Sequence, residues 1–236
     1  MTIDFARQKS VEAGRWAAMH IKSARLAAFH QVAAKLIGNK PIYQRIEAHL
    51  VGLGKGVPWW VIAVIDERES GGHCNAQLGQ GDPLGYVSTH VPAGRGPFFG
   101  ADAFDRSCYD ALIDCAPHAA LWADWTAGGV MCILEQYNGE GYWLHGMPSP
   151  YLWSGTDQYA RGKYVRDGVF DYTAVDEQLG CAGLIATMKA IDGSIAFAAA
   201  PGRWVTAAPA SSGSSSAPAP IGVSTSADKS WWQVWK

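Results

Sequence analysis

An uninterrupted apolar run from Val57 to Ile65 constrains the fold of this chain more than any other feature. All nine of its residues are apolar, so the segment offers no polar face to water and is expected to cross the centre of a domain. Pro58 suits the first turn of a helix, where its missing N–H is not needed, and Gly71 and Gly72 supply a left-handed stop at the other end. The sequence therefore predicts a buried helix whose last turn contains Glu69.

The carboxyl of Glu69 is predicted to keep its proton to an unusually high pH. Glu69 follows Ile62 and Ile65 at helical spacings of seven and four residues, and it meets the partial negative charge of a helix C-terminus. Poor solvation and that charge both raise its pKa, and a carboxyl that is protonated near neutral pH can act as a general acid. Asp66 and Glu67 compete for this role, but Glu69 is closest to the helix stop. An ordinary solvated glutamate is the alternative.

Composition narrows the classes of partner that the chain is expected to bind. Its 236 residues are 48% hydrophobic, enough for one full core with extensions, and a net charge of -2 gives no broad basic surface for nucleic acid. Eleven Trp and nine Tyr exceed what a core requires, so some are expected to line a groove for a flat, partly apolar ligand such as a sugar ring. The five cysteines are scattered without a CxxC pair, so we expect no disulfide framework, metal or cofactor.

The chain also lacks the usual signals of membrane targeting. No apolar run approaches the roughly 20 residues of a membrane span, and the N-terminus has no continuous hydrophobic region of a secretory signal. We therefore expect no stable membrane insertion, and a protein that stays in the cytoplasm until another factor releases it.

Helical patterns dominate the chain. Residues about 5–37 form an amphipathic pattern, with Gly14 as its candidate break and with four apolar residues on one face: Leu26, Phe29, Ala33 and Leu36. Further helices are expected at about 42–53, 101–115, 119–137 and 173–191.

Two stretches are expected to lack long helices. Residues 73–100 are rich in Gly, Pro, Asn and Asp and are predicted to form loops with a short hairpin at about residues 86–91. Residues 138–171 are irregular and dense in aromatics, and a loop of that length inside a domain is often functional. The predicted domain, 1–205 with a helical extension over about 1–40, is followed by an Ala/Ser/Pro-rich flexible linker, 206–227, and a Trp-rich tail, 228–236.

Two motifs resemble those of a known superfamily. The segment Arg68–Gly71, at the end of a buried helix, resembles the Glu-Ser-Gly signature of lysozyme-like lytic transglycosylases and phage endolysins, in which the Glu is the catalytic acid. About 65 residues later, Leu134–Gly139 resembles the Tyr-Asn-Gly motif of the same superfamily. The resemblance implies that Tyr137 reaches toward the catalytic carboxylate and that Asn138 lies along the sugar-binding groove.

A longer set of motifs is similar to that of a group of phage and bacterial lysozyme-like proteins. The segments follow one another in the order typical of that group, over about residues 57–191, and the ordered set is more specific than any one motif. They are Arg68–Ser70, Gly81–Leu84, Val91–Arg95, Tyr137–Gly139, Ser149–Ser154, Gly162–Val165 and Asp167–Gly168.

The resemblance implies cleavage of the β-1,4 bond between N-acetylmuramic acid and N-acetylglucosamine in peptidoglycan, with Glu69 protonating the glycosidic oxygen. With a second carboxylate, water can be activated; without one, the muramyl 6-hydroxyl can close a 1,6-anhydro ring. Asp82 is the nearest candidate for a second catalytic carboxylate, although an Asp before Pro83 is equally typical of a turn. Asp82 and Thr89 match the Glu-Asp-Thr triad of phage lysozymes in order but not in spacing.

Further side chains are candidates for contact with a glycan. Tyr137 needs a partner for its phenol if it is buried, and Glu69 is a suitable one. Tyr151 and Trp153 alternate as in a strand or extended loop, so one of them is expected to stack on a sugar while the other packs. Three polar residues complete the expected substrate contacts: Ser70, Gln80 and Thr89.

The sequence as a whole predicts a mainly α, lysozyme-like α+β domain: a helical bundle around a central buried helix, with a small loop or hairpin lobe. Its expected activity is that of a peptidoglycan glycosidase of endolysin or muramidase type. We expect a monomer that meets glycan strands after its release from the host cytoplasm to the cell wall. The alternatives are a lytic transglycosylase, a chitinase-like hydrolase, and a non-catalytic wall-binding or virion structural module.

Overall fold

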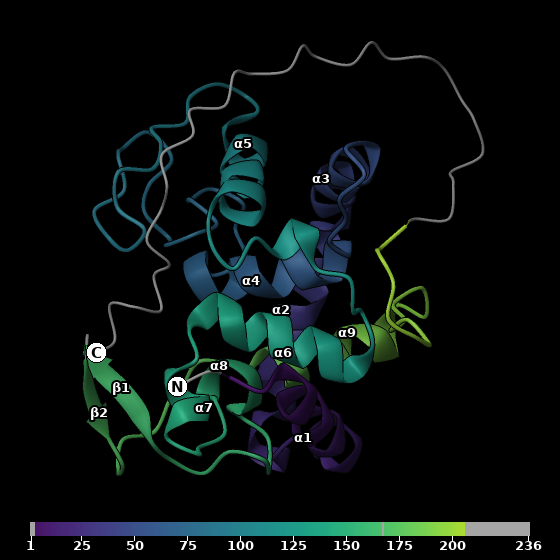
Figure 1. The fold of residues 1–236 in the computed structure, drawn as a ribbon, viewed down its shortest axis with the longest axis vertical. Helices are drawn as coiled ribbons and strands as arrows, with labels where there is room; N and C mark the ends of the chain where they lie inside the picture. Colours follow the sequence, from purple (N-terminus) through teal and green to yellow (C-terminus); the bar gives the residue numbers. More distant parts are fainter. Residues whose placement is uncertain (1–2, 167, 206–236) are drawn as a thin grey trace.

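The apolar run forms helix α4, Trp59–Ser70, which lies at the centre of the ribbon in Figure 1. The computed structural model describes residues 3–166 and 168–205. Pro58 precedes the helix, and Gly71 ends it in a left-handed conformation with φ 75°. Every residue from Trp59 to Asp66 is buried, so the predicted core helix is confirmed.

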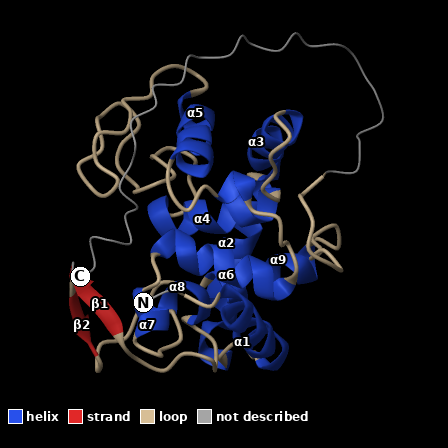
Figure 2. Cartoon of the chain, viewed as in Figure 1, coloured by secondary structure: helices blue, strands red, loops and turns tan. Residues whose placement is uncertain are grey.

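The domain is mainly helical, as the sequence predicts, with a two-stranded sheet (Figure 2). Before α4 come α1 Phe5–Ala18, the 3-10 turn η1 Ser23–Arg25, α2 Leu26–Gly38 and α3 Lys40–Gly52. After α4 come α5 Ala103–Tyr109, the π-helical turn η2 Asp110–Asp114, the 3-10 turn η3 Ala119–Leu121, α6 Ala127–Asn138, α7 Gly141–Leu144, α8 Pro150–Trp153, β1 Lys163–Arg166, β2 Val169–Asp171 and α9 Cys181–Ile191.

The core forms where helices from both halves of the chain pack around α4. Helix α1 lies along α6, α2 lies along α9, and α4 contacts α2, α3 and α9. Trp60, Trp125 and Trp153 are among the largest fully buried side chains. The N-terminal helices are thus part of this core, because α1 and α2 each cover a helix from the C-terminal half.

The N-terminal helical pattern breaks at residues 19–22 and not at Gly14, which lies inside α1. At the break, Ile21 forms an antiparallel bridge with Thr156, and this tertiary pairing competes with another turn of helix. Leu26, in the first turn of α2, is 43% exposed instead of buried. The other three residues of the predicted face are buried: Phe29, Ala33 and Leu36.

Two predicted helices begin later than the sequence pattern indicates. Helix α6 begins after Thr126, whose hydroxyl caps it by accepting a hydrogen bond from the Gly129 N–H at 3.3 Å. Helix α9 begins at Cys181, after a stretch in which Asp176 pairs with Arg68 and the Gly180 N–H donates to the Ser154 carbonyl at 2.9 Å. The residues before both helices are thus held by contacts that the hydropathy pattern does not reveal.

The short hairpin predicted within residues 73–100 does not form at 86–91, which is a loop; an isolated antiparallel bridge in that stretch joins Ala76 and Pro83 instead. The Asp82 carboxylate, instead of a partner strand, accepts the backbone N–H groups of Thr89 and His90. The strands that do pair are β1 and β2, which run antiparallel with Lys163 opposite Asp171.

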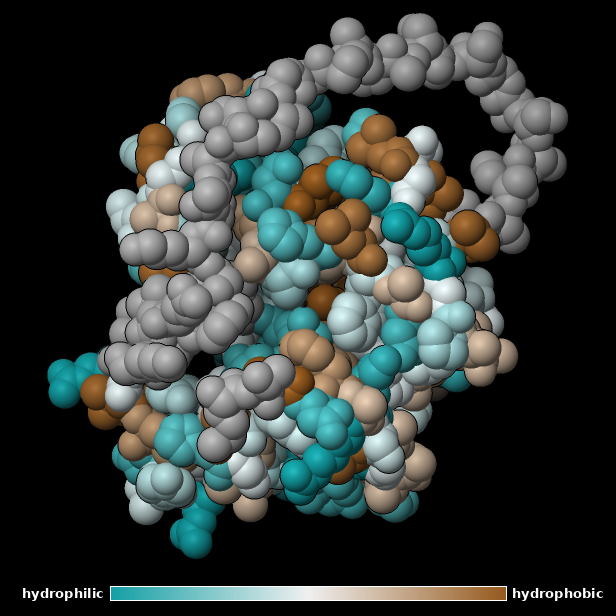
Figure 3. All heavy atoms as spheres, in the orientation of Figure 1, coloured by the Kyte–Doolittle hydropathy of each residue, from teal (hydrophilic) through white to brown (hydrophobic). Residues whose placement is uncertain are grey.

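The described surface seen in Figure 3 mixes hydrophilic and hydrophobic residues. Within the described ranges, no helix combines the length and the apolar character needed to cross a membrane. All five cysteines are free thiols, and the part of the chain that the structure describes contains no group of three or more His, Cys, Asp or Glu side chains arranged to hold a metal ion. The predicted linker, 206–227, and the predicted Trp-rich tail, 228–236, lie outside the described residues.

Candidate active site

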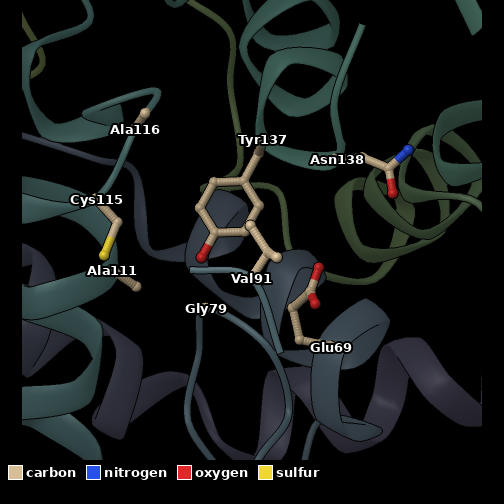
Figure 4. Close-up of a pocket in the computed structure, with 8 residues that line it drawn as sticks. All are labelled: Glu69, Gly79, Val91, Ala111, Cys115, Ala116, Tyr137 and Asn138. Carbon is tan, nitrogen blue, oxygen red and sulfur yellow. The ribbon is translucent and has the colours of Figure 1, made fainter. Parts of the chain in front are cut away.

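Glu69, in the last turn of α4, lines a cavity of about 160 Å³ (Figure 4). Figure 4 shows the Glu69 carboxyl and the Tyr137 ring directed into the same space. The structure therefore brings together the two motifs that first suggest the resemblance, 68–71 and 134–139. The other lining residues come from the loop after α4, from η2 and the turn behind it, and from the end of α6: Gly79, Val91, Ala111, Cys115, Ala116 and Asn138.

A glycine allows the loop after α4 to close on the end of that helix. Gly81 has φ 71°, and a Cβ at this position would clash with the carbonyl oxygen of Glu69. A larger residue would push the loop away from α4, and with it the cavity wall at Gly79. The motif that begins with Gly81 thus has a packing role beside the candidate acid.

Burial raises the pKa of Glu69 to about 7. Two neighbours oppose this rise: the Tyr151 hydroxyl donates to Glu69 Oε1 at 3.1 Å, and the positive charge of Arg68 favours the carboxylate, whereas the negative charge of Asp66 adds to the rise. The protonated and ionised forms of Glu69 are therefore both well populated near neutral pH. The direction predicted from the sequence is confirmed, and burial is its main cause.

The two competing acids of α4 have other partners. Asp66 is fully buried and accepts a hydrogen bond from the Tyr43 hydroxyl at 2.7 Å. Glu67 forms an ion pair with Lys35 at 2.6 Å. Of the three acids near the end of α4, Glu69 alone lines the cavity.

The phenol that meets Glu69 belongs to Tyr151 and not to Tyr137. The Tyr137 hydroxyl donates to the carbonyl oxygen of Leu78 at 3.1 Å, so the predicted Tyr137–Glu69 hydrogen bond is wrong. Tyr151 reaches the carboxyl because it lies on α8, which packs against α6 and α9. Tyr137 remains part of the site as a wall of the cavity.

The predicted extended conformation of Tyr151 and Trp153 is also wrong, because both lie in helix α8. Their exposed fractions are 2% and 0%, so neither ring can stack on a sugar. Trp153 packs in the core, where its Nε1–H donates to Glu12 Oε2 at 2.8 Å. The pair Ser149 and Pro150 is a helix-start signal, and it could have indicated α8.

Asp82 lies outside the Glu69 cavity. It lines a separate pocket of about 240 Å³ together with Pro83, Tyr86, Val87 and Thr89. Its carboxylate accepts the backbone N–H of Thr89 at 3.0 Å and lies 2.8 Å from His90 Nδ1. Burial favours the neutral form, but the hydrogen bonds from His90 and Thr89 outweigh it and hold the pKa of Asp82 below its usual value. This geometry matches the interpretation of Asp82 as a turn residue.

The three polar residues predicted to contact substrate take part in local structure. Ser70 donates to a carbonyl one turn back in α4 at 3.1 Å, and Gln80 donates to the Pro92 carbonyl at 2.8 Å. Thr89 is exposed and lines the separate pocket of Asp82. Asn138, by contrast, lines the Glu69 cavity, where the resemblance implies that it should lie.

Two charged residues near Glu69 were not among the sequence candidates. Arg68 and Asp176 form an ion pair at 3.0 Å, and the Arg68 guanidinium lies 4.9 Å from the centre of the Tyr151 ring. Asp176 is 108 residues away from Arg68 in the chain, so no local pattern could have linked them.

Comparisons of this chain with protein-family models, with curated proteins and with solved structures find no match. Inference about its function therefore rests on the geometry of the Glu69 cavity and on the motif resemblance. Both centre on one helix end, which makes Glu69 the residue to test first.

Proposed function

We propose that this protein cleaves the glycan strands of peptidoglycan, with Glu69 as the general acid. The observation that carries the proposal is a carboxyl with a pKa of about 7, at the end of a buried helix and in the wall of a cavity. The ordered motifs around Glu69 and Tyr137 support peptidoglycan as the substrate, because they resemble those of lysozyme-like enzymes. The bond cleaved is the β-1,4 link between N-acetylmuramic acid and N-acetylglucosamine.

The chemistry requires a group that gives a proton and then takes one. Protonated Glu69 donates to the glycosidic oxygen as the bond breaks, which leaves Glu69 as a carboxylate. The Tyr151 hydroxyl, 3.1 Å from Glu69 Oε1, stabilises that carboxylate by a hydrogen bond. The same carboxylate then accepts the proton of the hydroxyl that attacks the sugar.

The number of carboxylates at the cavity bears on the product. Glycosidases that use two carboxyl groups hold them roughly 5–10 Å apart, on either side of the scissile bond. Among the described residues that line the cavity, Glu69 is the only acid, and Asp82 is bound by Thr89 and His90 at a separate pocket. This arrangement favours attack by the muramyl 6-hydroxyl, which closes a 1,6-anhydro ring, over hydrolysis assisted by a second carboxylate.

The size of the cavity suits a polymeric substrate of which one glycosidic linkage enters the cavity at a time. Its volume of about 160 Å³ is smaller than the roughly 300–1,000 Å³ of pockets that enclose a whole small-molecule ligand. It would hold the groups at the scissile bond, while the rest of the strand crosses its mouth.

Cleavage of purified peptidoglycan by the full chain tests the proposal. We expect the native protein and Glu67→Gln to clear sacculi, because Glu67 pairs with Lys35 and does not line the cavity. Glu69→Gln should lower the rate by about 100-fold or more, which is typical of the loss of a general acid. Equal clearing by Glu69→Gln would remove Glu69 from the mechanism.

Further outcomes separate the alternatives. No clearing by the native protein, together with its co-sedimentation with sacculi, would favour a wall-binding module. Faster release of sugar from chitin than from sacculi would favour a chitinase-like hydrolase. Mass spectrometry of the fragments distinguishes 1,6-anhydro ends from the reducing ends that hydrolysis leaves.

A further inference from the structure

A buried arginine connects the candidate acid to a distant anion. Arg68 directly precedes Glu69 in α4, and its side chain is only 7% exposed. Its guanidinium carbon lies 4.9 Å from the centre of the Tyr151 ring, and its Nη2 donates to Asp176 Oδ2 at 3.0 Å. Because Tyr151 donates to Glu69 at 3.1 Å, these four residues form one connected set of contacts.

Asp176 is held in place from several directions. Its Oδ1 lies 3.3 Å from Lys163 Nζ. Its backbone N–H donates to the Tyr159 hydroxyl at 3.1 Å, and its carbonyl accepts a hydrogen bond from the Ser154 hydroxyl at 2.6 Å. Burial opposes its ionisation, but Arg68 and Lys163 hold the pKa of Asp176 below its usual value. Asp176 is therefore an anion that is fixed next to Arg68.

Two charged neighbours act directly on Glu69: the Arg68 guanidinium favours its ionised form, and the negative charge of Asp66 favours its neutral form. The guanidinium does not lose its proton in proteins, so it permanently favours the ionised form of a nearby carboxyl. Asp176 offsets that charge at a place with little solvent to screen it. A carboxyl beside an uncompensated arginine would ionise at a lower pH and would keep its proton less readily for a leaving oxygen.

We infer that the Arg68–Asp176 ion pair is a positioning device for the proposed general acid. It holds the Tyr151 ring within hydrogen-bond reach of Glu69, and its balanced charge allows Glu69 to keep its proton. The inference rests on the proposed function for its role in catalysis. The expected effect of the ion pair on the pKa of Glu69, however, can be tested without any substrate.

The titration of Glu69 in the full chain tests the inference, and it can be followed by NMR of labelled carboxyl carbons with Glu69→Gln to assign the signal. Asp176→Asn leaves Arg68 uncompensated, so we expect the Glu69 midpoint to fall by about 0.5 or more on the pH scale. Arg68→Gln removes the cation, and the midpoint should rise by a similar amount. Tyr151→Phe removes a single hydroxyl that stabilises the carboxylate, and it should also raise the midpoint.

Shifts of the Glu69 midpoint in opposite directions in Asp176→Asn and Arg68→Gln exclude a purely structural role for the ion pair. Loosened packing would admit water and would lower every midpoint toward the usual value for glutamate. The double variant Arg68→Gln/Asp176→Asn keeps a neutral pair and should return the midpoint close to native. Movement of both single variants in the same direction, or of neither, overturns the inference. If Arg68→Gln does not fold, a double variant whose midpoint stays as low as that of Asp176→Asn overturns it.

The pH profile of cleavage gives a second readout. Because protonated Glu69 is the active form, the rate should fall as the pH rises through its midpoint. Asp176→Asn should move this fall to lower pH, and Arg68→Gln should move it to higher pH. If the midpoints move as expected while native protein leaves peptidoglycan intact, the electrostatic inference stands and the proposed function fails.

Discussion

Carboxyl groups with a pKa of about 7 occur both at the candidate active site and in a sealed interface between helices. At the site, Glu69 lines a cavity. In the interface, Glu140 lies beside α1, where Gln8 Nε2 donates to it at 2.8 Å and to Glu135 at 3.2 Å. Burial is the main cause of the raised pKa in both places.

The interface differs from the site in its access to solvent. We call the carboxyls of Glu12, Glu135 and Glu140, together with the amide of Gln8, the α1–α6 cluster, and none of these residues is more than 6% exposed. Side chains with so little exposed surface cannot meet a substrate. Burial in either place raises the pKa of a carboxyl, but only a carboxyl that also lines a cavity is a candidate acid.

The cluster and the site are nevertheless connected through α8. Glu12 of the cluster accepts a hydrogen bond from Trp153 Nε1 at 2.8 Å. Trp153 lies in the same short helix as Tyr151, which donates to Glu69. The cluster therefore helps to fix the position of α8, the helix on which Tyr151 lies.

The largest expected contrast between the two places is in activity. Glu69→Gln and Glu140→Gln each replace a carboxyl with a pKa of about 7 by an amide of similar shape. We expect cleavage of purified peptidoglycan to fall about 100-fold or more with the first and less than about 2-fold with the second. Circular dichroism would confirm that both variants fold. Similar losses of activity in both variants would contradict the assignment of the catalytic acid to Glu69 alone.

The next contrast is in the dependence of stability on pH. The pKa of Glu140 in the folded protein, about 7, lies above its usual value of 4.5, so the folded state binds more protons between these values. The free energy of unfolding should therefore fall as the pH rises through this window, by roughly 1–3 kcal/mol. Urea denaturation at a series of pH values measures this loss.

Two variants test whether the cluster causes this loss of unfolding free energy. Glu135→Gln/Glu140→Gln should make the pH dependence shallower, because amides do not titrate in this range, while Glu69, whose pKa is also about 7, keeps its own contribution. Glu177→Gln is the control, since the Glu177 side chain is 78% exposed, and it should keep the native slope. A native slope in the double variant would show that the cluster is not the source.

A smaller contrast concerns the wall of the cavity. Gly81 and Gly94 both have positive φ, 71° and 82°, but only at Gly81 would a Cβ meet another residue, at the Glu69 carbonyl. We expect Gly94→Ala to cost about 1 kcal/mol of stability and Gly81→Ala about 2 kcal/mol or more, with slower cleavage. Equal losses in stability and activity would mean that the loop is free to shift without disturbing the site.

The smallest expected effect is that of Asp82→Asn. The asparagine oxygen can still accept the Thr89 N–H, and the weakened contact with the largely exposed His90 is worth less than about 1 kcal/mol. Cleavage should stay within about 3-fold of native, because Asp82 lies outside the Glu69 cavity. A fall of about 100-fold, with stability unchanged, would make Asp82 a second catalytic carboxylate.

Parts of the fold could be predicted because they depend on interactions between residues that are close together in the sequence. The apolar run in α4 must be buried whatever packs against it, and Gly71 adopts φ 75° without a steric cost. The hairpin at 86–91 could not be excluded in this way, because the loop is held by a side chain, Asp82, that no periodicity reveals. The peptidoglycan substrate comes from the motif resemblance and stays a prediction.

By itself, the sequence determined a buried helix that ends in an acid with a raised pKa, because apolar neighbours and a glycine stop act within one segment. Only the tertiary structure decided which groups meet that acid. Tyr151 lies 82 residues from Glu69, and its reach depends on how α8 packs on α6 and α9. Tyr137, which the motif favoured, instead donates to a loop carbonyl. Local propensity cannot choose between two such phenols, because both the cavity and the hydrogen bond arise from contacts between distant segments.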